Sequence, residues 1–249
     1  MSYSIAFAGK GGTGKTTMAG LLVKYLVEKG KAPVLAVDAD ANANLNEVLG
    51  LEVSETLGNA REEMKRGVSS GMTKDIFMEM KLQEAVVEAS GFDLIVMGRP
   101  EGAGCYCAAN SLLTVYLEKL IDNYAYVVMD NEAGMEHLSR LTTNNIDVLL
   151  VVSDPTRRGI QAAARIVALT DELKLNIHRK LLLVNQAKKG QEEAIRQVVE
   201  RYSLELIGMV PEDARVREFD LSGRPTIELD RESEAFRAAY AVFDKIFEK

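Results

Sequence analysis

The stretch GKGGTGKT, at residues Gly9–Thr16, has the spacing G-x-x-x-x-G-K-[ST] of a phosphate-binding loop. It follows the apolar run Ser4–Ala8 and opens the amphipathic stretch Thr16–Lys29, so the motif lies between an expected strand and an expected helix. Glycines let backbone N–H groups approach phosphate oxygens without a Cβ clash, and the positive end of the helix points at the same oxygens. The stretch therefore predicts a P-loop nucleotide-binding fold.

The side chains of this loop predict how it would hold a nucleotide such as ATP or ADP. Lys15 is expected to neutralise the β- and γ-phosphates, and the hydroxyl of Thr16 is expected to bind Mg²⁺. The residues expected to contact the nucleotide are Gly11, Gly12, Thr13, Gly14, Lys15, Thr16 and Thr17.

The rest of the chain alternates short apolar runs with longer amphipathic stretches. The expected strands are Ser4–Ala8, Pro33–Val37, Phe92–Met97, Tyr126–Met129, Val148–Val152, Lys180–Val184 and Glu205–Met209. The expected helices are Thr16–Lys29, Thr73–Ala89, Ser111–Ile121, Ile160–Leu173, Glu192–Tyr202 and Glu232–Phe247. This alternation predicts an α/β fold: a mostly parallel seven- or eight-stranded sheet flanked by helices, with residues 1–249 as a single domain. Residues 52–91, helical and charged without a clear strand, are expected to be an excursion from the sheet.

Composition argues against several classes of function. The 249 residues carry 30 Lys and Arg against 37 Asp and Glu, a net charge of −7. A net negative charge does not attract nucleic acid, which is itself negative. No segment approaches the roughly 20 continuous apolar residues that a membrane helix needs, and the first residues do not resemble a signal peptide. We therefore expect a cytoplasmic protein that binds neither nucleic acid nor membrane.

Acidic side chains follow two of the expected strands. Asp38 and Asp40 come after Pro33–Val37, and Asp130 directly ends Tyr126–Met129, which is the Walker B form. Carboxylates at the carboxyl ends of parallel strands project into the crevice where ligands bind. Asp130 is thus expected to hold Mg²⁺, and Asp38 to support either Mg²⁺ or the loop that follows it. Capping of a short helix near Leu45 is an alternative use of Asp38 and Asp40.

The second lysine of the loop, Lys10, makes the sequence KGGTGKTT resemble the deviant Walker A motif of the nucleotide-dependent dimerising ATPases, which include the nitrogenase iron protein and the MinD and ParA types. The resemblance implies a homodimer with two ATP molecules, in which Lys10 reaches the nucleotide of the partner subunit. It also implies that Asp40 positions or deprotonates the attacking water, so that Lys10, Lys15 and Asp40 are the expected catalytic residues. A solvated loop charge is the alternative for Lys10.

Four further residues match nucleotide contacts of this family. Gly134 completes the pattern D-x-x-x-G that begins at Asp130, and its amide is expected to bond the γ-phosphate. Asn185, after Lys180–Val184, matches the position that reads the adenine ring. Pro211 and Asp213 resemble the second loop that flanks the adenine, although ordinary turn chemistry accounts for them nearly as well.

The chain has two cysteines, Cys105 and Cys107, in a glycine-flanked segment. Side chains two residues apart in an extended segment lie on one side, so both thiolates can face one ion. Two sulfurs do not complete a tetrahedral Zn²⁺ site, but two copies of the chain would supply four. Thiolates also suit square-planar Ni²⁺ or an iron–sulfur cluster. Two incidental or buried cysteines are the alternative.

The cysteine pair and the stretch DNEAGMEHL at residues 130–138 together resemble the CooC/AcsF-type maturation ATPases. This resemblance covers essentially the whole chain. It implies an ATP-dependent metallochaperone that binds nickel or zinc and serves a nickel enzyme, carbon monoxide dehydrogenase or acetyl-CoA synthase. Two alternatives stay open: an iron–sulfur protein for ATP-gated electron transfer, and a partitioning or positioning ATPase.

Overall fold

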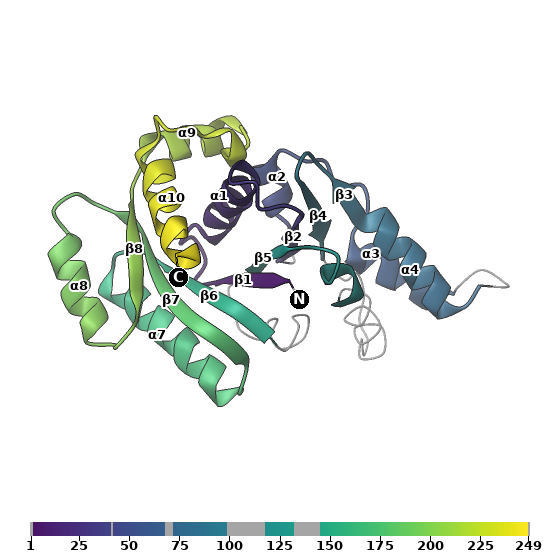
Figure 1. Ribbon diagram of the computed structural model, residues 1–249, viewed down its shortest axis with the longest axis horizontal. Helices are drawn as coiled ribbons and strands as arrows, with labels where there is room; N and C mark the ends of the chain where they lie inside the picture. The colour runs from purple at the N-terminus through teal and green to yellow at the C-terminus, as the bar shows by residue number, and fades with distance from the viewer. Residues whose placement is uncertain (1, 41, 68–71, 99–117, 132–144, 249) are drawn as a thin grey trace.

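The computed structural model describes residues 2–40, 42–67, 72–98, 118–131 and 145–248. Eight strands form one sheet in the order β3-β4-β2-β5-β1-β6-β7-β8 (Figure 1). The strands are β1 (Tyr3–Ala8), β2 (Val34–Ala39), β3 (Val86–Glu88), β4 (Phe92–Val96), β5 (Tyr126–Asn131), β6 (Asn145–Ser153), β7 (Asn176–Ala187) and β8 (Leu206–Pro211). All neighbours pair in parallel except β3, which runs antiparallel to β4. The expected α/β fold is confirmed.

Helices cover both faces of the sheet, as a parallel sheet requires. The helices are α1 (Lys15–Glu28), α2 (Leu45–Leu49), α3 (Leu57–Arg66), α4 (Lys74–Ala85), α7 (Arg157–Glu172), α8 (Glu192–Glu200), α9 (Ala214–Ser222), the 3₁₀ turn η1 (Thr226–Glu228) and α10 (Glu234–Phe247). Side chains that alternate along each strand supply two separate cores. Along β1, Ile5 and Phe7 join the core beneath α1 and α10, whereas Ala6 and Ala8 join the core that faces α3, α4, α7 and α8.

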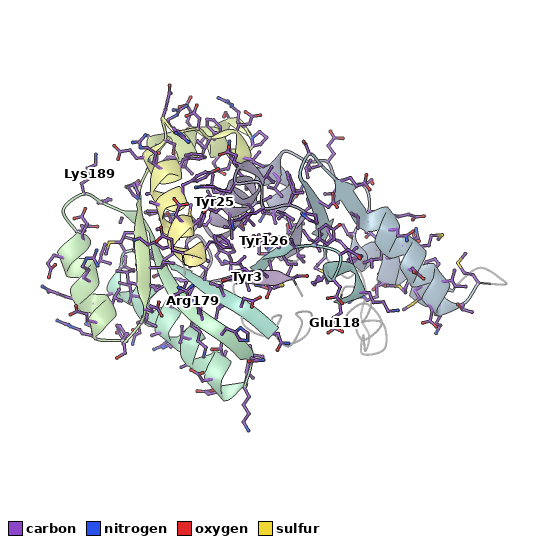
Figure 2. The ribbon with its side chains drawn as sticks, viewed as in Figure 1. Tyr3, Tyr25, Glu118, Tyr126, Arg179 and Lys189 are labelled. Carbon is purple, nitrogen blue, oxygen red and sulfur yellow. The ribbon has the colours of Figure 1, made fainter. Side chains whose placement is uncertain are left out.

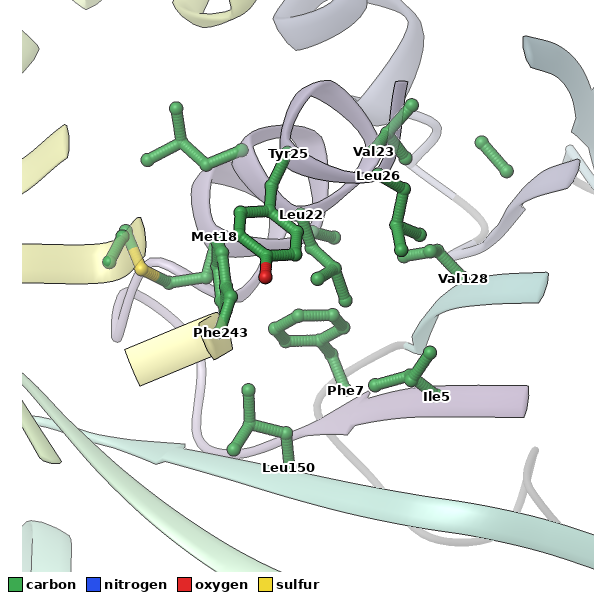
Figure 3. Packing of buried hydrophobic residues seen from close by; sticks show 14 of the residues in the cluster. Ile5, Phe7, Met18, Leu22, Val23, Tyr25, Leu26, Val128, Leu150 and Phe243 are labelled. Carbon is green, nitrogen blue, oxygen red and sulfur yellow. The ribbon is translucent and has the colours of Figure 1, made fainter. Parts of the chain in front are cut away.

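The first core packs the phosphate-loop helix tightly onto the sheet. Phe7 of β1, Leu22 of α1 and Phe243 of α10 are all fully buried there (Figure 3). Tyr25 of α1 stacks on Phe247 of α10, with ring centroids 5.8 Å apart and planes 11° from parallel. Apolar burial on this scale stabilises the domain and fixes the position of α1, whose first residue, Lys15, belongs to the predicted phosphate loop.

The secondary structure differs from the expected one at two places. The helix expected over Thr73–Ala89 ends at Ala85, and Val86–Glu88 instead form the edge strand β3. The two β-branched valines at its start suit a strand, and the free edge of β4 supplies its pairing partner. Residues 52–91 therefore do contribute a strand. The second difference is the helix α9, since no helix was expected over Ala214–Ser222.

Candidate nucleotide-binding site

The phosphate loop runs from the end of β1 to the first turn of α1. Gly9 and Gly14 have φ values of 148° and 86°, in the region that favours glycine. A Cβ on Gly9 would lie 2.2 Å from the carbonyl oxygen of Val152, and one on Gly14 would lie 2.4 Å from Nδ2 of Asn185. Neither position can hold a side chain without moving its neighbours. Glycine is thus required at positions 9 and 14 by the packing of the loop against β6 and β7.

The two lysines of the loop differ in their surroundings. Lys15 is buried, with 8% of its surface exposed, and its positive charge partly opposes the rise that burial causes in the pKa of the nearby Asp130. Lys10 is exposed, and no hydrogen bond or ion pair of its side chain is formed with the described residues. Its carbonyl oxygen accepts a hydrogen bond of 2.9 Å from the Thr13 hydroxyl, which braces the loop. Lys15 therefore faces the site from within, whereas Lys10 extends into solvent.

Asp38, at the end of β2, organises the loop after that strand. Its carboxylate is fully buried and accepts hydrogen bonds from the backbone N–H groups of Asp40, at 3.0 Å, and Leu45, at 2.9 Å. Burial raises the pKa of Asp38 to about 6, against the opposing effect of these two hydrogen bonds. The sequence left open whether Asp38 would bind Mg²⁺, support the following loop or cap the helix near Leu45. Its hydrogen bonds hold that loop and the first turn of α2.

Asp40 lies two residues further on and is only partly buried. Its Oδ1 accepts a hydrogen bond of 2.8 Å from the backbone N–H of Asn42, and its side chain lines the cleft beside Lys15 and Thr16. Asp38 thus holds the backbone N–H of Asp40, a residue that lines the same cleft as the phosphate loop. A carboxylate there can hold a water molecule next to bound phosphate.

Asp130, at the end of β5, lies next to Asp38 on the neighbouring strand. The Thr16 hydroxyl lies near enough to this carboxyl group to favour its charged form, yet Oδ1 is buried and has no hydrogen-bond partner among the described residues. Burial, opposed by Thr16 and Lys15 and reinforced by Asp38, raises the pKa of Asp130 to about 7. A buried carboxylate oxygen without a partner, beside a hydroxyl, is the donor set that Mg²⁺ prefers. The residues present therefore fit a magnesium ion.

The two polar residues expected at the adenine are held by the protein. Nδ2 of Asn185 donates to the carbonyl oxygen of Thr13 at 2.8 Å, so this side chain already contacts the phosphate loop. The carboxylate of Asp213 caps two helices: it accepts from the backbone N–H groups of Arg215 in α9 and Ala235 in α10, and from the Ser233 hydroxyl. Burial would raise the pKa of Asp213, but these hydrogen bonds outweigh it and lower the pKa.

One cleft of about 1260 Å³ gathers most of the predicted nucleotide residues. Those that line it are Gly11, Gly12, Gly14, Lys15, Thr16, Thr17, Asp40, Asn185, Pro211 and Asp213. They come from the phosphate loop, the segment after β2 and the ends of β7 and β8, which meet at one edge of the sheet. A cleft above the usual range of about 300–1,000 Å³ for small-molecule sites can hold a molecule the size of ATP.

Three predicted site residues, Cys105, Cys107 and Gly134, lie outside the described residues. Among the residues that the structure does describe, no group of three or more His, Cys, Asp or Glu side chains is placed to hold a metal ion. The described helices include none that is both long and apolar enough to cross a membrane.

Sequence reasoning missed several residues that line the cleft, among them Arg217, Arg224 and Gln186, and Gln186 also contacts the phosphate loop. Its Nε2 donates to the carbonyl oxygen of Gly12 at 3.3 Å, and its side chain lines the cleft. Its backbone φ of 59° is unusual for a residue other than glycine. No signal in the sequence marks this conformation, because glutamine has no preference for it.

Comparisons with known proteins agree with this geometry. A family model described as the CobQ/CobB/MinD/ParA nucleotide binding domain matches residues 5–227. The chain is 42% identical, over 98% of both chains, to an uncharacterized ATP-binding protein of Methanocaldococcus jannaschii. It is 30% identical to the carbon monoxide dehydrogenase accessory protein CooC of Rhodospirillum rubrum, over 88% of this chain and 87% of that protein. The MinC:MinD cell division protein complex of Aquifex aeolicus contains a chain of the same fold, with a TM-score of 0.76, 22% identity and coverage of 100% of this chain and 96% of that one.

Proposed function

Because the chain belongs to the CobQ/CobB/MinD/ParA family of nucleotide-binding ATPase domains, we propose that it is an ATP-dependent maturation factor for a nickel enzyme. In this proposal a homodimer hydrolyses ATP and carries Ni²⁺, or Zn²⁺, between the Cys105 and Cys107 pairs of its two subunits. The client is carbon monoxide dehydrogenase or acetyl-CoA synthase. The observation that carries the ATPase part is that Lys15, Thr16 and Asp40 line one cleft.

The residues around the cleft divide the work of hydrolysis. Lys15 and the N–H groups of the loop bind the phosphates, and the positive end of α1 adds to their attraction. Asp40 aligns the water that attacks the γ-phosphate, and Lys10 of each subunit neutralises charge on the nucleotide of the other. Thr16 and Asp130 would hold Mg²⁺, which when bound offsets negative charge on the phosphates.

The nickel part of the proposal has separate support. The CooC relative of Rhodospirillum rubrum is named for carbon monoxide dehydrogenase, and the two chains align over most of their lengths. The C-x-C pair supplies two soft thiolates per subunit, and a twofold axis would bring four together. Nickel is cargo in this scheme, so the ATP cycle would change the dimer and thereby the thiolate site.

Three variants of the full chain test the ATPase, nickel and dimer parts of the proposal. Lys15→Ala should abolish phosphate release from ATP, because the charge that faces the phosphates is removed. The double variant Cys105→Ser/Cys107→Ser should lose the one Ni²⁺ ion per dimer measured by equilibrium dialysis and metal analysis, while its ATP binding stays intact. Lys10→Ala should remain monomeric, by light scattering, in the presence of ATP and Mg²⁺. Nickel retention in the double cysteine variant would overturn the metallochaperone assignment.

The decisive assay is activation of a nickel-free client. Nickel-free carbon monoxide dehydrogenase, incubated with Ni²⁺, ATP and the wild-type chain, should gain activity, and the Lys15→Ala variant should not support this gain. Visible absorption of the anaerobically purified protein would instead favour an iron–sulfur electron-transfer role. ATP-dependent sedimentation with anionic phospholipid vesicles, or retention on DNA, would instead favour a positioning or partitioning ATPase.

A further inference from the structure

The end of β7 departs from regular pairing where it meets the phosphate loop. The pairs that flank the irregularity are Val184 with Met209 and Ala187 with Pro211. Two residues of β7, Asn185 and Gln186, therefore oppose one residue of β8, which is the arrangement of a β-bulge. Neighbouring side chains of a regular strand point to opposite faces, whereas a bulge can redirect one of them.

Both side chains of this bulge reach the phosphate loop. Asn185 Nδ2 donates to the carbonyl oxygen of Thr13 at 2.8 Å, and Gln186 Nε2 donates to that of Gly12 at 3.3 Å. A carbonyl oxygen only accepts, so the amide nitrogen of each side chain must face the loop. Two successive amides thus hold two successive carbonyl groups. Because these carbonyl groups point toward the side chains of β7, they do not occupy the side of the loop where its N–H groups would bind phosphate.

The backbone at Gln186 adds an independent observation. Its φ of 59° lies in the left-handed region, where glycine or asparagine is usual. The side chain is exposed, so burial of apolar surface does not explain why a long residue occupies this position. Its hydrogen bond to Gly12 is the one contact that accounts for it.

We propose that Gln186 is a positioning residue, which together with Asn185 holds the phosphate loop in the shape that accepts nucleotide. This inference rests on the proposed nucleotide-binding function and extends it. Asn185 is also the residue that the sequence resemblance assigns to the adenine ring, so the bulge would connect that contact to the phosphate loop.

Three substitutions in the full chain separate positioning from general stability. Gln186→Met keeps the length and the strained backbone but has no donor, whereas Gln186→Gly removes both the donor and the strain. Ser203→Gly is the matched control, since Ser203 has a φ of 53° and does not line the cleft. Titration of ADP by calorimetry, steady-state ATP hydrolysis and thermal unfolding are measured for each.

Both Gln186 variants should bind ADP about two- to tenfold more weakly, as expected for the loss of one hydrogen bond. KM for ATP should rise by a similar factor with kcat nearly unchanged, because the loop contacts phosphates before as well as during the reaction. Gln186→Gly should unfold at the same temperature as wild type or higher, and Ser203→Gly should leave ADP affinity unchanged. Wild-type affinity in both Gln186 variants would overturn the proposal, as would a loss of affinity that merely follows a loss of stability. A wild-type chain that binds no ADP would instead overturn the proposed function.

Discussion

Asp130 is the last residue but one of β5, and Asp213 lies two residues after β8, at the same edge of the sheet, yet their carboxylates are used in opposite ways. Asp213 accepts three hydrogen bonds from the starts of α9 and α10, and its pKa is lowered. Asp130 keeps one buried oxygen without a partner in the described chain, and its pKa is raised to about 7. The contrast shows that position at the sheet edge does not define a ligand-binding carboxylate. A carboxylate whose oxygens already accept hydrogen bonds from the protein has a structural role. A carboxylate with a buried oxygen that accepts none is suited to bind a ligand.

The largest effect that this contrast predicts is on catalysis. Asp130→Asn should lower the kcat of ATP hydrolysis about 100-fold or more, because the carboxylate that would hold Mg²⁺ becomes a neutral amide. The variant should unfold at no lower temperature than wild type, since a buried group with a raised pKa is being made neutral. Phosphate release and thermal unfolding test both statements. Near-wild-type turnover in Asp130→Asn would remove the distinction between the two carboxylates.

The next effect is on the pH dependence of stability. Asp38 and Asp130 have folded-state pKa values of about 6 and about 7, above the ordinary value of 3.8, so the folded state keeps protons that the unfolded state has released. The free energy of unfolding of the nucleotide-free protein should therefore fall as pH rises from about 4 to 7, by about 1.4 kcal/mol per unit of pKa difference. Urea unfolding between pH 4.5 and 7.5, with a chelator present, measures this slope. Asp130→Asn should flatten it, and an equal slope in the variant would mean that burial of Asp130 is not its cause.

A smaller effect on stability is expected at Asp213. Asp213→Ala should lower the free energy of unfolding by about 1–3 kcal/mol, because the first turns of α9 and α10 lose their acceptor. Its kcat should stay within about twofold of wild type, in contrast to Asp130→Asn. Asp220→Ala, an exposed position on α9, is the control for loss of one negative charge. Weaker ADP binding at unchanged stability would instead favour the role in adenine recognition expected from the sequence.

The smallest effect concerns the residue beside Asp213. Glu212 forms an ion pair with Arg217, and both side chains are well exposed. Glu212→Gln should change the free energy of unfolding by at most about 0.5 kcal/mol, since solvent and salt screen such pairs. Urea unfolding at low and high salt checks this. A larger loss of unfolding free energy that disappears at high salt would mean that this exposed ion pair stabilises α9, in addition to the carboxylate of Asp213.

The sequence predicted those parts of the fold whose cause is local. The phosphate loop and the seven apolar strands follow from residue type and spacing, and all were found. The strand β3 was missed because three residues at the end of a helical pattern acquire their partner only when β4 lies beside them. The helix α9 was missed because its short, charged sequence has no clear apolar stripe.

The site was predicted by position better than by contact. Asn185 and Asp213 do line the cleft, but a motif cannot tell whether a polar side chain is already bound by its own protein. Gln186 could not be found at all, since its part in the site depends on a bulge that forms only when β7 pairs with β8. Long-range pairing, and not residue type, decides these details.

The packing of α1 against α10 has a consequence for the order of events during synthesis. The helix α1, which follows the phosphate loop, is made early, yet Phe243 and Phe247, whose rings contact its Tyr25, are made about 220 residues later. Figure 2 labels Tyr25, which lies near α10. Until α10 leaves the ribosome, one face of the sheet has an open apolar surface. The nucleotide site therefore reaches its final rigidity only when nearly the whole chain has been translated, so a ribosome-bound fragment should have no working phosphate loop.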